Sequence, residues 1–440
     1  PHVEHKLFLS ATPHNGYSES FTALLELLDN QRFARGMEPD REQLARVMVR
    51  RLKSEMKSWD GTARFPERRL EALEVQYTEA EREAHRLLNE YAQLRIKGAT
   101  TETERYATEF VLKLLKKRLF SSPEAFALTL EKHEETLANA RKRTVSVRPS
   151  AGILRRQLEA LDEDADNDED LEEAAASALE AAAPLFHPPT PRERELLDRL
   201  GAWANKTRLR QDSKATRLLA WLKEIVRPGG NWSNERVIIF TEYRATQKWL
   251  LGLLAAENMV ANDRVMTLYG GMTTEDRERV KAAFQAHPSE APVRILLATD
   301  AASEGIDLQN HCSRLIHYEI PWNPNRLEQR NGRIDRHGQK AGWVNIFHFV
   351  GSNYHKSAKS DLEISAGDLE GDLEFLMRAV QKVNRIREDL GKVGPVIAEQ
   401  VEEAMLGQRR RLDTFAAEDK AAGVRRLLAF ERKLQDQVAR

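Results

Sequence analysis

The chain has 440 residues, enough for two or three domains with separate hydrophobic cores. Its 68 Lys and Arg residues nearly balance 69 Asp and Glu residues, and the net charge of -1 restricts any nucleic-acid surface to a local basic patch. The single cysteine, Cys312, excludes an internal disulfide and a multi-cysteine metal site. The sequence shows no apolar run of about 18 residues and no signal peptide, which predicts a cytoplasmic protein without a membrane span.

The first hundred residues alternate between apolar strands and amphipathic helices. The apolar start of residues 7–16 predicts a strand, and because no initiator methionine precedes it we expect a piece of a longer polypeptide. A helix is predicted for residues 18–28. The alternation of residues 70–77 predicts a second strand, and Thr78 with Glu81 forms a capping-box pattern that opens the next helix.

Residues 98–210 are a helical, charge-rich insertion. Two basic clusters in it have two open interpretations, a contact with a DNA backbone or a solvated helix face. The clusters are Lys113, Lys116, Lys117 and Arg118, and Arg141, Lys142, Arg143 and Arg148. The acidic stretch 162–173 superficially suggests a calcium site. It lacks the glycine and the terminal glutamate of an EF-hand loop, so the sequence predicts a disordered linker.

From Ser213 onward, strands and helices alternate. Helices are predicted for residues 214–226, 246–256 and 274–285, and strands for residues 236–240, 265–269, 295–298, 315–320 and 344–350. This alternation predicts a parallel sheet covered by helices on both faces, with ligands at the carboxyl ends of the strands. Thr241, Gly270, Gly271 and Thr299 follow these ends, and their hydroxyls and backbone amides suit contacts with phosphodiesters.

An arginine-rich segment follows the fourth of these strands, residues 315–320. Two prolines bracket Trp322 and Asn323 in a loop, and a helix is predicted to carry Arg326, Arg330, Arg333 and Arg336. Arg333 and Arg336 are three residues apart and would project from one face of that helix, where guanidinium groups suit a polyphosphate. A solvated basic helix is the alternative. The tail predicts further helices at residues 369–390, 396–406 and 418–438.

Several segments together resemble the motifs of superfamily II helicases and translocases. Residues 329–336, QRNGRIDR, match the QxxGRxxR pattern, and the spacing from Asn323 to Gln339 resembles that of Swi/Snf-type ATPases. SATPHN at residues 10–15 resembles motif III, and RRLK at residues 50–53 resembles the segment that joins the two lobes of such motors. VIIFTEY, LYGGMTTEDR and ILLATDAASEGIDL resemble motifs IV, IVa and V in order. The chain is thus similar to the C-terminal half of a bacterial RapA-like protein, and residues 388–400 are similar to tails of phage-restriction proteins of the DISARM type.

The resemblance implies an α/β fold, in which a RecA-like parallel-sheet lobe carries a large helical insertion and a helical C-terminal tail. It implies that Arg333 and Arg336 act as arginine fingers, that Gln329 orients contacts between lobes, and that Asp307 beside Gly305 reaches the ribose or nucleotide edge. The nucleic-acid contacts would come from residues in or beside five of these segments. These are Ser10, Thr12, Thr241, Gly270, Gly271, Thr299, Trp322 and Asn323.

The same resemblance divides the chain into five parts. Residues 1–58 would end a first lobe, 59–97 begin the second, 98–210 form the insertion, 211–350 complete the second lobe and 351–440 form the tail. Neither a GxxxxGK[ST] phosphate loop nor a DExH box is present, so ATP and Mg²⁺ would need an N-terminal lobe and this part alone should not hydrolyse ATP.

The implied activity is ATP-driven translocation on double-stranded DNA in a nucleoid-associated bacterial protein. Protein partners would bind through the insertion and tail. Two alternatives are a strand-separating helicase on RNA or single-stranded DNA, and a non-catalytic regulatory lobe.

Overall fold

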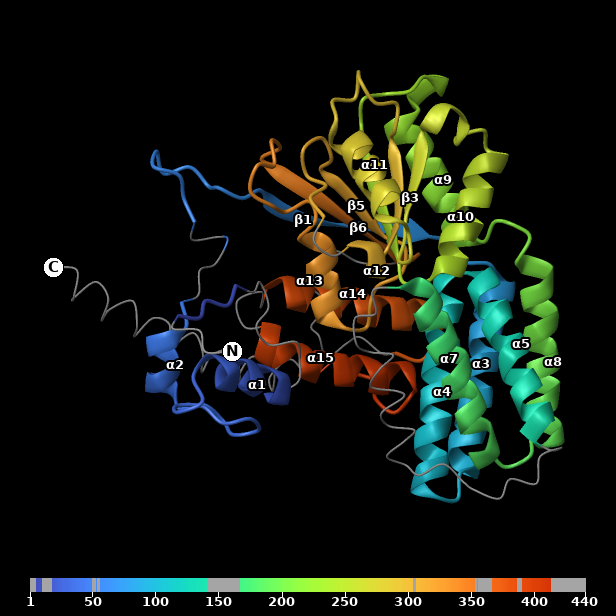
Figure 1. Cartoon of the computed structure of the whole chain (residues 1–440). Coiled ribbons are helices and arrows are strands. Elements are labelled where there is room, and N and C mark those ends of the chain that lie inside the picture. Colours follow the sequence, from blue (N-terminus) through green and yellow to red (C-terminus); the bar gives the residue numbers. More distant parts are fainter. Residues whose placement is uncertain are drawn as a thin grey trace.

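The computed structural model describes residues 5–9, 18–49, 53, 56–140, 167–303, 306–352, 354, 366–385 and 390–412. Within these residues, six parallel strands form one sheet in the order β1-β6-β5-β2-β4-β3 (Figure 1). The strands are β1 (Glu67–Val75), β2 (Val237–Thr241), β3 (Val265–Leu268), β4 (Ile295–Thr299), β5 (Arg314–His317) and β6 (Trp343–Gly351). The predicted fold class, a RecA-like parallel-sheet lobe, is therefore confirmed.

Helices cover both faces of the sheet, and its central strands are buried throughout. All five residues of β2 and of β4 are buried, as expected for parallel strands packed on both sides. One face packs against α9 (Ser213–Val226) and α10 (Arg244–Ala256), and the other against α11 (Thr274–Gln285). Two shorter connecting helices, α12 (Asp300–Ser303) and α13 (Pro324–Asn331), follow β4 and β5.

The insertion between β1 and β2 is a helical bundle beside the sheet (Figure 1). Its helices are α3 (Glu79–Gly98), α4 (Glu102–Ser121), α5 (Pro123–Ala140), α7 (Asp168–Ala182) and α8 (Pro191–Thr207). The Thr78–Glu81 capping box at the start of α3 is confirmed. Leu88, Tyr91, Leu115 and Leu196 are among the buried residues of a core that belongs to the bundle itself.

The acidic stretch is not the linker that the sequence predicts. From Asp168 onward it forms α7, and the Asn167 side chain caps it by accepting the backbone N–H of Glu169. Acidic residues in a first helical turn are stabilised by the helix dipole, and the alanine-rich sequence that follows favours a helix. The acidic composition of this stretch therefore did not reveal that a helix begins at Asp168. The preceding acidic residues, 162–166, lie outside the described part of the chain.

The two ends of the chain provide smaller helices. α1 (Ser18–Leu28) has the predicted bounds, and α2 (Arg41–Val47) follows it. α14 (Leu369–Arg385) and α15 (Leu390–Met405) pack together, with α14 against β6. The helix predicted at residues 418–438 lies outside the described residues.

The strand predicted at the start of the chain is absent from the described residues 5–9. Leu7, Phe8 and Leu9 form no strand there and are 82%, 48% and 87% exposed. No described strand pairs with them, so the prediction of a buried strand is wrong for residues 7–9, and residues 10–16 of the predicted stretch lie outside the described residues. Three adjacent exposed apolar side chains are unusual for a surface that faces only water.

Candidate functional site

The helix of the arginine motif is shorter than the sequence predicts. α13 is capped by Asn323, whose side chain accepts the N–H of Asn325 at 2.9 Å, and it runs only from Pro324 to Asn331. Gly332 follows, and glycine is among the least favourable residues inside a helix. Residues 332–338, here called the arginine loop, continue in turns. The expectation that Arg333 and Arg336 project from one face of a helix is therefore wrong.

Arg336 lies at the surface of the arginine loop. Its guanidinium forms an ion pair with the carboxylate of Asp307, and the two side chains are 38% and 48% exposed. The sequence assigned both residues to a nucleotide site without predicting that they would contact each other. An exposed ion pair typically contributes only about 0–1 kcal/mol. Arg336 can therefore exchange Asp307 for another anion at little cost.

The other residues predicted for the nucleotide site differ in exposure. Arg333 is buried, and its backbone carbonyl accepts the N–H of Leu308 at 3.2 Å, which joins the arginine loop to the segment carrying Asp307. Gln329 is half-buried on α13. Gly305 lies outside the described residues. The structure thus brings Arg333, Arg336 and Asp307 into one locality.

A buried ionic network holds the arginine loop in place. Asp335, between the two predicted fingers, accepts a hydrogen bond from Nε of Arg68 at 2.5 Å. The same guanidinium binds both carboxylate oxygens of Glu328 at 2.6 and 2.8 Å. The side chains of Arg68 and Asp335 are each 2% exposed. Sequence reasoning missed this network, because its members lie on β1, α13 and the loop and no local pattern connects them.

The predicted lobe-joining segment reaches the same network. Lys53 lies 3.4 Å from the Asp335 carboxylate, and its ammonium also donates to the Asp335 backbone carbonyl. The Lys53 ammonium lies 5.5 Å from the centroid of the Phe65 ring. Arg50 and Arg51, the two arginines of the same segment, lie outside the described residues. The lysine of this segment is therefore connected directly to the arginine loop.

Arg330 is a structural arginine. Its side chain is 1% exposed and binds the Asp300 carboxylate through two nitrogens, at 2.5 and 2.8 Å. A third contact is made to the backbone carbonyl of Glu319 at 3.2 Å. These bonds tie α13 to the ends of β4 and β5, so this member of the arginine series is not available to a polyphosphate.

The carboxyl ends of the strands are not the open edge that the sequence predicts. Thr241 and Thr299 are buried. The hydroxyl of Thr299 and the backbone N–H of Gly270 both donate to the Asp168 carboxylate, each at 2.7 Å. Among the four predicted contacts at this edge, Gly271 alone is exposed. The expected accessibility is wrong because the start of α7 covers Gly270 and Thr299, and Glu319 binds the hydroxyl of Thr241.

The remaining predicted nucleic-acid contacts are less accessible than expected or lie outside the described residues. Trp322 is 4% exposed and belongs to the core shared with α14 and α15. Asn323 is half-buried and caps α13. Both residues therefore have structural roles in this conformation. Ser10 and Thr12 are outside the described residues.

A buried carboxyl group connects the insertion to the sheet. Glu319 follows β5 and accepts hydroxyl hydrogen bonds from Ser121 of α4 and from Thr241 of β2, each at 3.2 Å. Burial raises the pKa of Glu319 to about 7, although the nearby Arg330 and Lys214 act in the opposite direction. A carboxyl group with such a pKa changes its charge near neutral pH.

Glu319 should make stability depend on pH. The folded state retains its proton up to about pH 7, whereas the unfolded chain loses it near pH 4.5, so the free energy of unfolding falls as pH rises between these values. This displacement corresponds to at most about 3 kcal/mol. Urea unfolding of the wild type and of Glu319→Gln at pH 5 and pH 8 should show a relative gain for the variant at the higher pH. An unchanged difference between the two proteins would contradict the assignment.

Three residues of the first basic cluster of the insertion form ion pairs with acidic side chains of other helices. Lys116 binds the Asp372 carboxylate of α14 at 2.7 Å, and Lys113 pairs with Glu402 of α15. Arg118 binds Glu172 of α7. The cluster therefore joins α4 to three other helices. The second cluster, at residues 141–148, lies outside the described residues.

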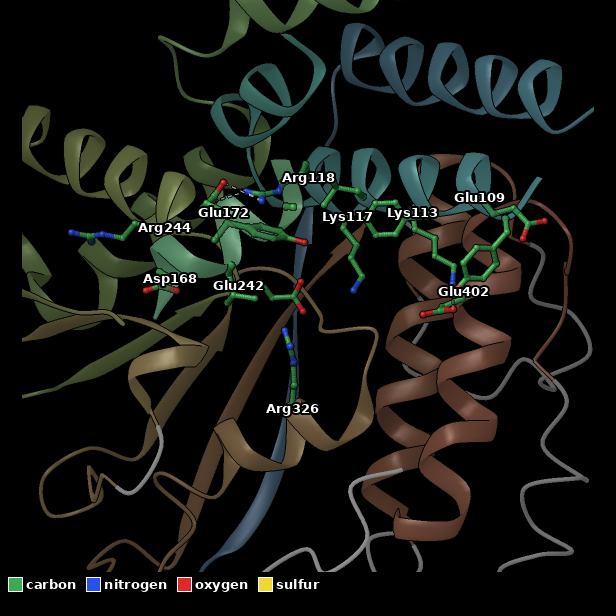
Figure 2. A pocket seen from close by; sticks show the side chains of 16 residues that line it. Glu109, Lys113, Lys117, Arg118, Asp168, Glu172, Glu242, Arg244, Arg326 and Glu402 are labelled. Carbon is green, nitrogen blue, oxygen red and sulfur yellow. Dashed lines mark hydrogen bonds and ion pairs between the residues drawn. The ribbon is translucent and has the colours of Figure 1, made fainter. Parts of the chain in front are cut away.

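A pocket of about 160 Å³ lies where the insertion, the sheet lobe and α15 meet. Figure 2 shows Lys113, Lys117 and Arg118 on one side and Arg326 opposite them. Acidic side chains, including Glu242 and those of the start of α7, line the same pocket. The charges are mixed, so the pocket does not by itself define a ligand.

The described residues contain no group of three His, Cys, Asp or Glu side chains arranged to hold a metal ion. The accessible guanidinium of Arg336 does suit an anionic phosphate group. In the same part of the chain, no helix has the length and hydrophobicity needed to cross a membrane.

Residues 217–338 match the protein family described as the helicase conserved C-terminal domain. This segment runs from α9 to the arginine loop and includes β2 to β5. Together with the parallel sheet, the match defines the class: this part of the chain is a helicase C-terminal domain with a RecA-like fold.

Two relatives match shorter segments of the chain. A segment of 130 residues is 39% identical to the uncharacterized ATP-dependent helicase YqhH of Bacillus subtilis, covering 30% of this chain and 20% of the relative. A segment of 106 residues is 33% identical to the RNA polymerase-associated protein RapA of Yersinia enterocolitica, covering 24% of this chain and 10% of RapA. The chain is thus similar to parts of an ATP-dependent helicase and of RapA, and it spans only a fifth or less of the length of either relative.

Among solved structures, the C-terminal part of the Fun30 ATPase domain overlays with a TM-score of 0.35 and 16% identity, covering 72% of this chain and 98% of that chain. A likeness at this level supports no conclusion about function. The similarity of the tail to DISARM-type proteins stays a prediction.

Proposed function

We propose that this chain supplies the second lobe of an ATP-dependent motor that moves along double-stranded DNA. The observation that carries the proposal is the accessible Arg336 on a loop held by the buried Arg68–Asp335 pair. A catalytic arginine must be accessible, yet its backbone must be fixed so that the guanidinium reaches a defined position. The arginine loop combines both properties.

In this proposal, Arg336 would leave Asp307 and bind the terminal phosphate of a nucleotide held between two lobes. Bound ATP with Mg²⁺ would supply the phosphoanhydride whose hydrolysis drives the motor. Arg336 would neutralise charge that develops on the transferred phosphoryl group. Arg333 and Gln329 would support the same interface, and Asp307 would be released toward the ribose or nucleotide edge.

A first lobe would provide the phosphate loop and the Mg²⁺ ligands. Two features of the chain support such a partner. The exposed apolar residues Leu7, Phe8 and Leu9 have the composition of a strand that pairs in another sheet. Lys53, in the segment that would join the lobes, contacts Asp335 and so couples lobe position to the arginine loop.

The proposal is tested by ATP hydrolysis in the full-length polypeptide that includes the first lobe. Phosphate release should be stimulated by double-stranded DNA and less by single-stranded DNA or RNA of equal length. Stronger stimulation by a single strand would favour the strand-separating alternative. Hydrolysis that is absent with every nucleic acid, in a protein shown to be folded, would favour a regulatory lobe instead.

A further inference from the structure

The first residue of α7, Asp168, accepts hydrogen bonds at the carboxyl ends of two strands. One carboxylate oxygen of Asp168 accepts two hydrogen bonds of 2.7 Å, from the backbone N–H of Gly270 after β3 and from the hydroxyl of Thr299 at the end of β4. The Asp168 residue is 3% exposed. The two donors come from neighbouring strands and converge on one acceptor atom.

These donors do not distinguish a carboxylate from a phosphodiester. Both anions present partially charged oxygens that accept hydrogen bonds from backbone N–H and hydroxyl groups, and such contacts are common with nucleic-acid backbones. The side chain of Asn167, the residue before α7, lies similarly close to Gly271. Its φ is +86°, and a Cβ built there would lie 2.8 Å from the side-chain oxygen of Asn167. The start of α7 is therefore seated directly on the strand ends.

A second acid on the same helix covers a cationic group nearby. Glu172 is four residues after Asp168, on the same face of α7. Its carboxylate binds two nitrogens of Arg118 at 2.9 and 3.3 Å, and this guanidinium lies 3.7 Å from the centroid of the Tyr243 ring after β2 (Figure 2). Two acidic side chains on one face of α7 thus bind hydrogen-bond donors beside the ends of β2, β3 and β4.

The Asp168 carboxylate lies at this edge although burial there removes its solvation. Burial raises the pKa of Asp168 above its ordinary value, while the hydrogen bonds from Thr299 and Gly270 lower it. Arg244 is the nearest basic influence, and its guanidinium lies over the Tyr269 ring, 3.3 Å from the centroid. Because burial removes the solvation of the Asp168 carboxylate, its net stabilisation at this edge is smaller than the gain from its two short hydrogen bonds.

We propose that Asp168 stands in the position of a nucleic-acid phosphate, and that the start of α7 is an internal competitor which must leave this edge before duplex DNA binds there. The inference rests on the proposed function for the identity of the partner. It assigns the Gly270 amide and the Thr299 hydroxyl to a phosphodiester oxygen, and it gives the helical insertion a regulatory role. It also explains why the predicted DNA contacts are covered in the structure.

Fluorescence anisotropy of a short labelled DNA duplex, titrated with the full chain, tests this competition. Asp168→Ala should bind the duplex about tenfold more tightly than the wild type, because two charge-assisted hydrogen bonds no longer have to be broken first. Glu172→Gln should change affinity in the same direction without altering the first turn of α7. The matched control is Glu180→Gln, which removes the same charge from the same helix but at a residue that is 56% exposed and paired with Lys132.

Hydrogen exchange of the wild type gives a second readout that needs no substitution. Amides of the first two turns of α7 should exchange faster when the duplex is added. The inference would be overturned if Asp168→Ala and Glu172→Gln bound the duplex with the same affinity as the Glu180→Gln control and if exchange in α7 stayed unchanged. DNA binding by the chain would remain in that case. If neither wild type nor any folded variant bound the duplex, the proposed function would fail, and this inference with it.

Discussion

Replacing Arg336 by alanine is expected to reduce DNA-stimulated ATP hydrolysis by about 10³- to 10⁵-fold in the full-length polypeptide. The loss corresponds to about 4–7 kcal/mol of transition-state stabilisation. Binding of ATP should remain mostly intact, because a finger acts on charge that develops during the reaction. The stability of the lobe should also change little, since Arg336 and its partner Asp307 are both partly exposed. Phosphate release at saturating duplex, with nucleotide affinity measured separately, checks these expectations.

A matched control for this change is Arg279→Ala on α11. Arg279 is 72% exposed and also pairs with a carboxylate, that of Asp276, so the substitution removes the same kind of side chain from the same lobe. Its ATPase activity should equal that of the wild type. Turnover at the wild-type rate in Arg336→Ala would refute the finger assignment. A matching loss of ATP affinity would instead indicate a ground-state binding role.

Replacing Arg68 by leucine is expected to lower the free energy of unfolding by about 3–5 kcal/mol. The change leaves two carboxylates, Asp335 and Glu328, without the guanidinium that binds both, and the Asp335 side chain is only 2% exposed. Removing one partner of a buried ion pair is costly because the remaining charge stays desolvated. Denaturation by urea, followed by circular dichroism, measures the effect.

The neighbouring arginine on β1 provides the control. Arg69 points to the opposite side of the strand, is exposed, and lies 4.1 Å from the centroid of the Trp343 ring. Arg69→Leu should lower the unfolding free energy by about 0.5–1 kcal/mol at most, the usual contribution of an exposed cation–π contact. Equal losses for both substitutions would mean that the buried network contributes no more than a surface contact.

Much of the sheet lobe could be predicted from sequence because its signals are local. The helix predicted for residues 274–285 is observed with the same bounds, since Thr273 caps it and a strand and a turn precede it. The strands β2 and β4 were predicted to within one residue at either end. Buried parallel strands are short apolar runs bounded by polar turns, and such runs are recognisable without knowledge of their neighbours.

The site could be predicted only in part, because its geometry depends on contacts between distant segments. Arg68 and Asp335 are 267 positions apart, and neither has a neighbour in sequence that marks it as a member of a pair. The covering of Thr299 by Asp168 is similarly non-local, with 131 positions between them. The sequence motifs therefore located Arg336 and the strand ends, but not the side chains that hold or cover them.

Movement along duplex DNA is measured most directly by a triplex-displacement assay beside a strand-displacement assay, with the full-length polypeptide and ATP. We expect that the third strand is released from the duplex in an ATP-dependent manner, that the two duplex strands stay paired, and that Arg336→Ala abolishes the release. Separation of the duplex strands without triplex displacement, or third-strand release that does not require ATP, would contradict this expectation.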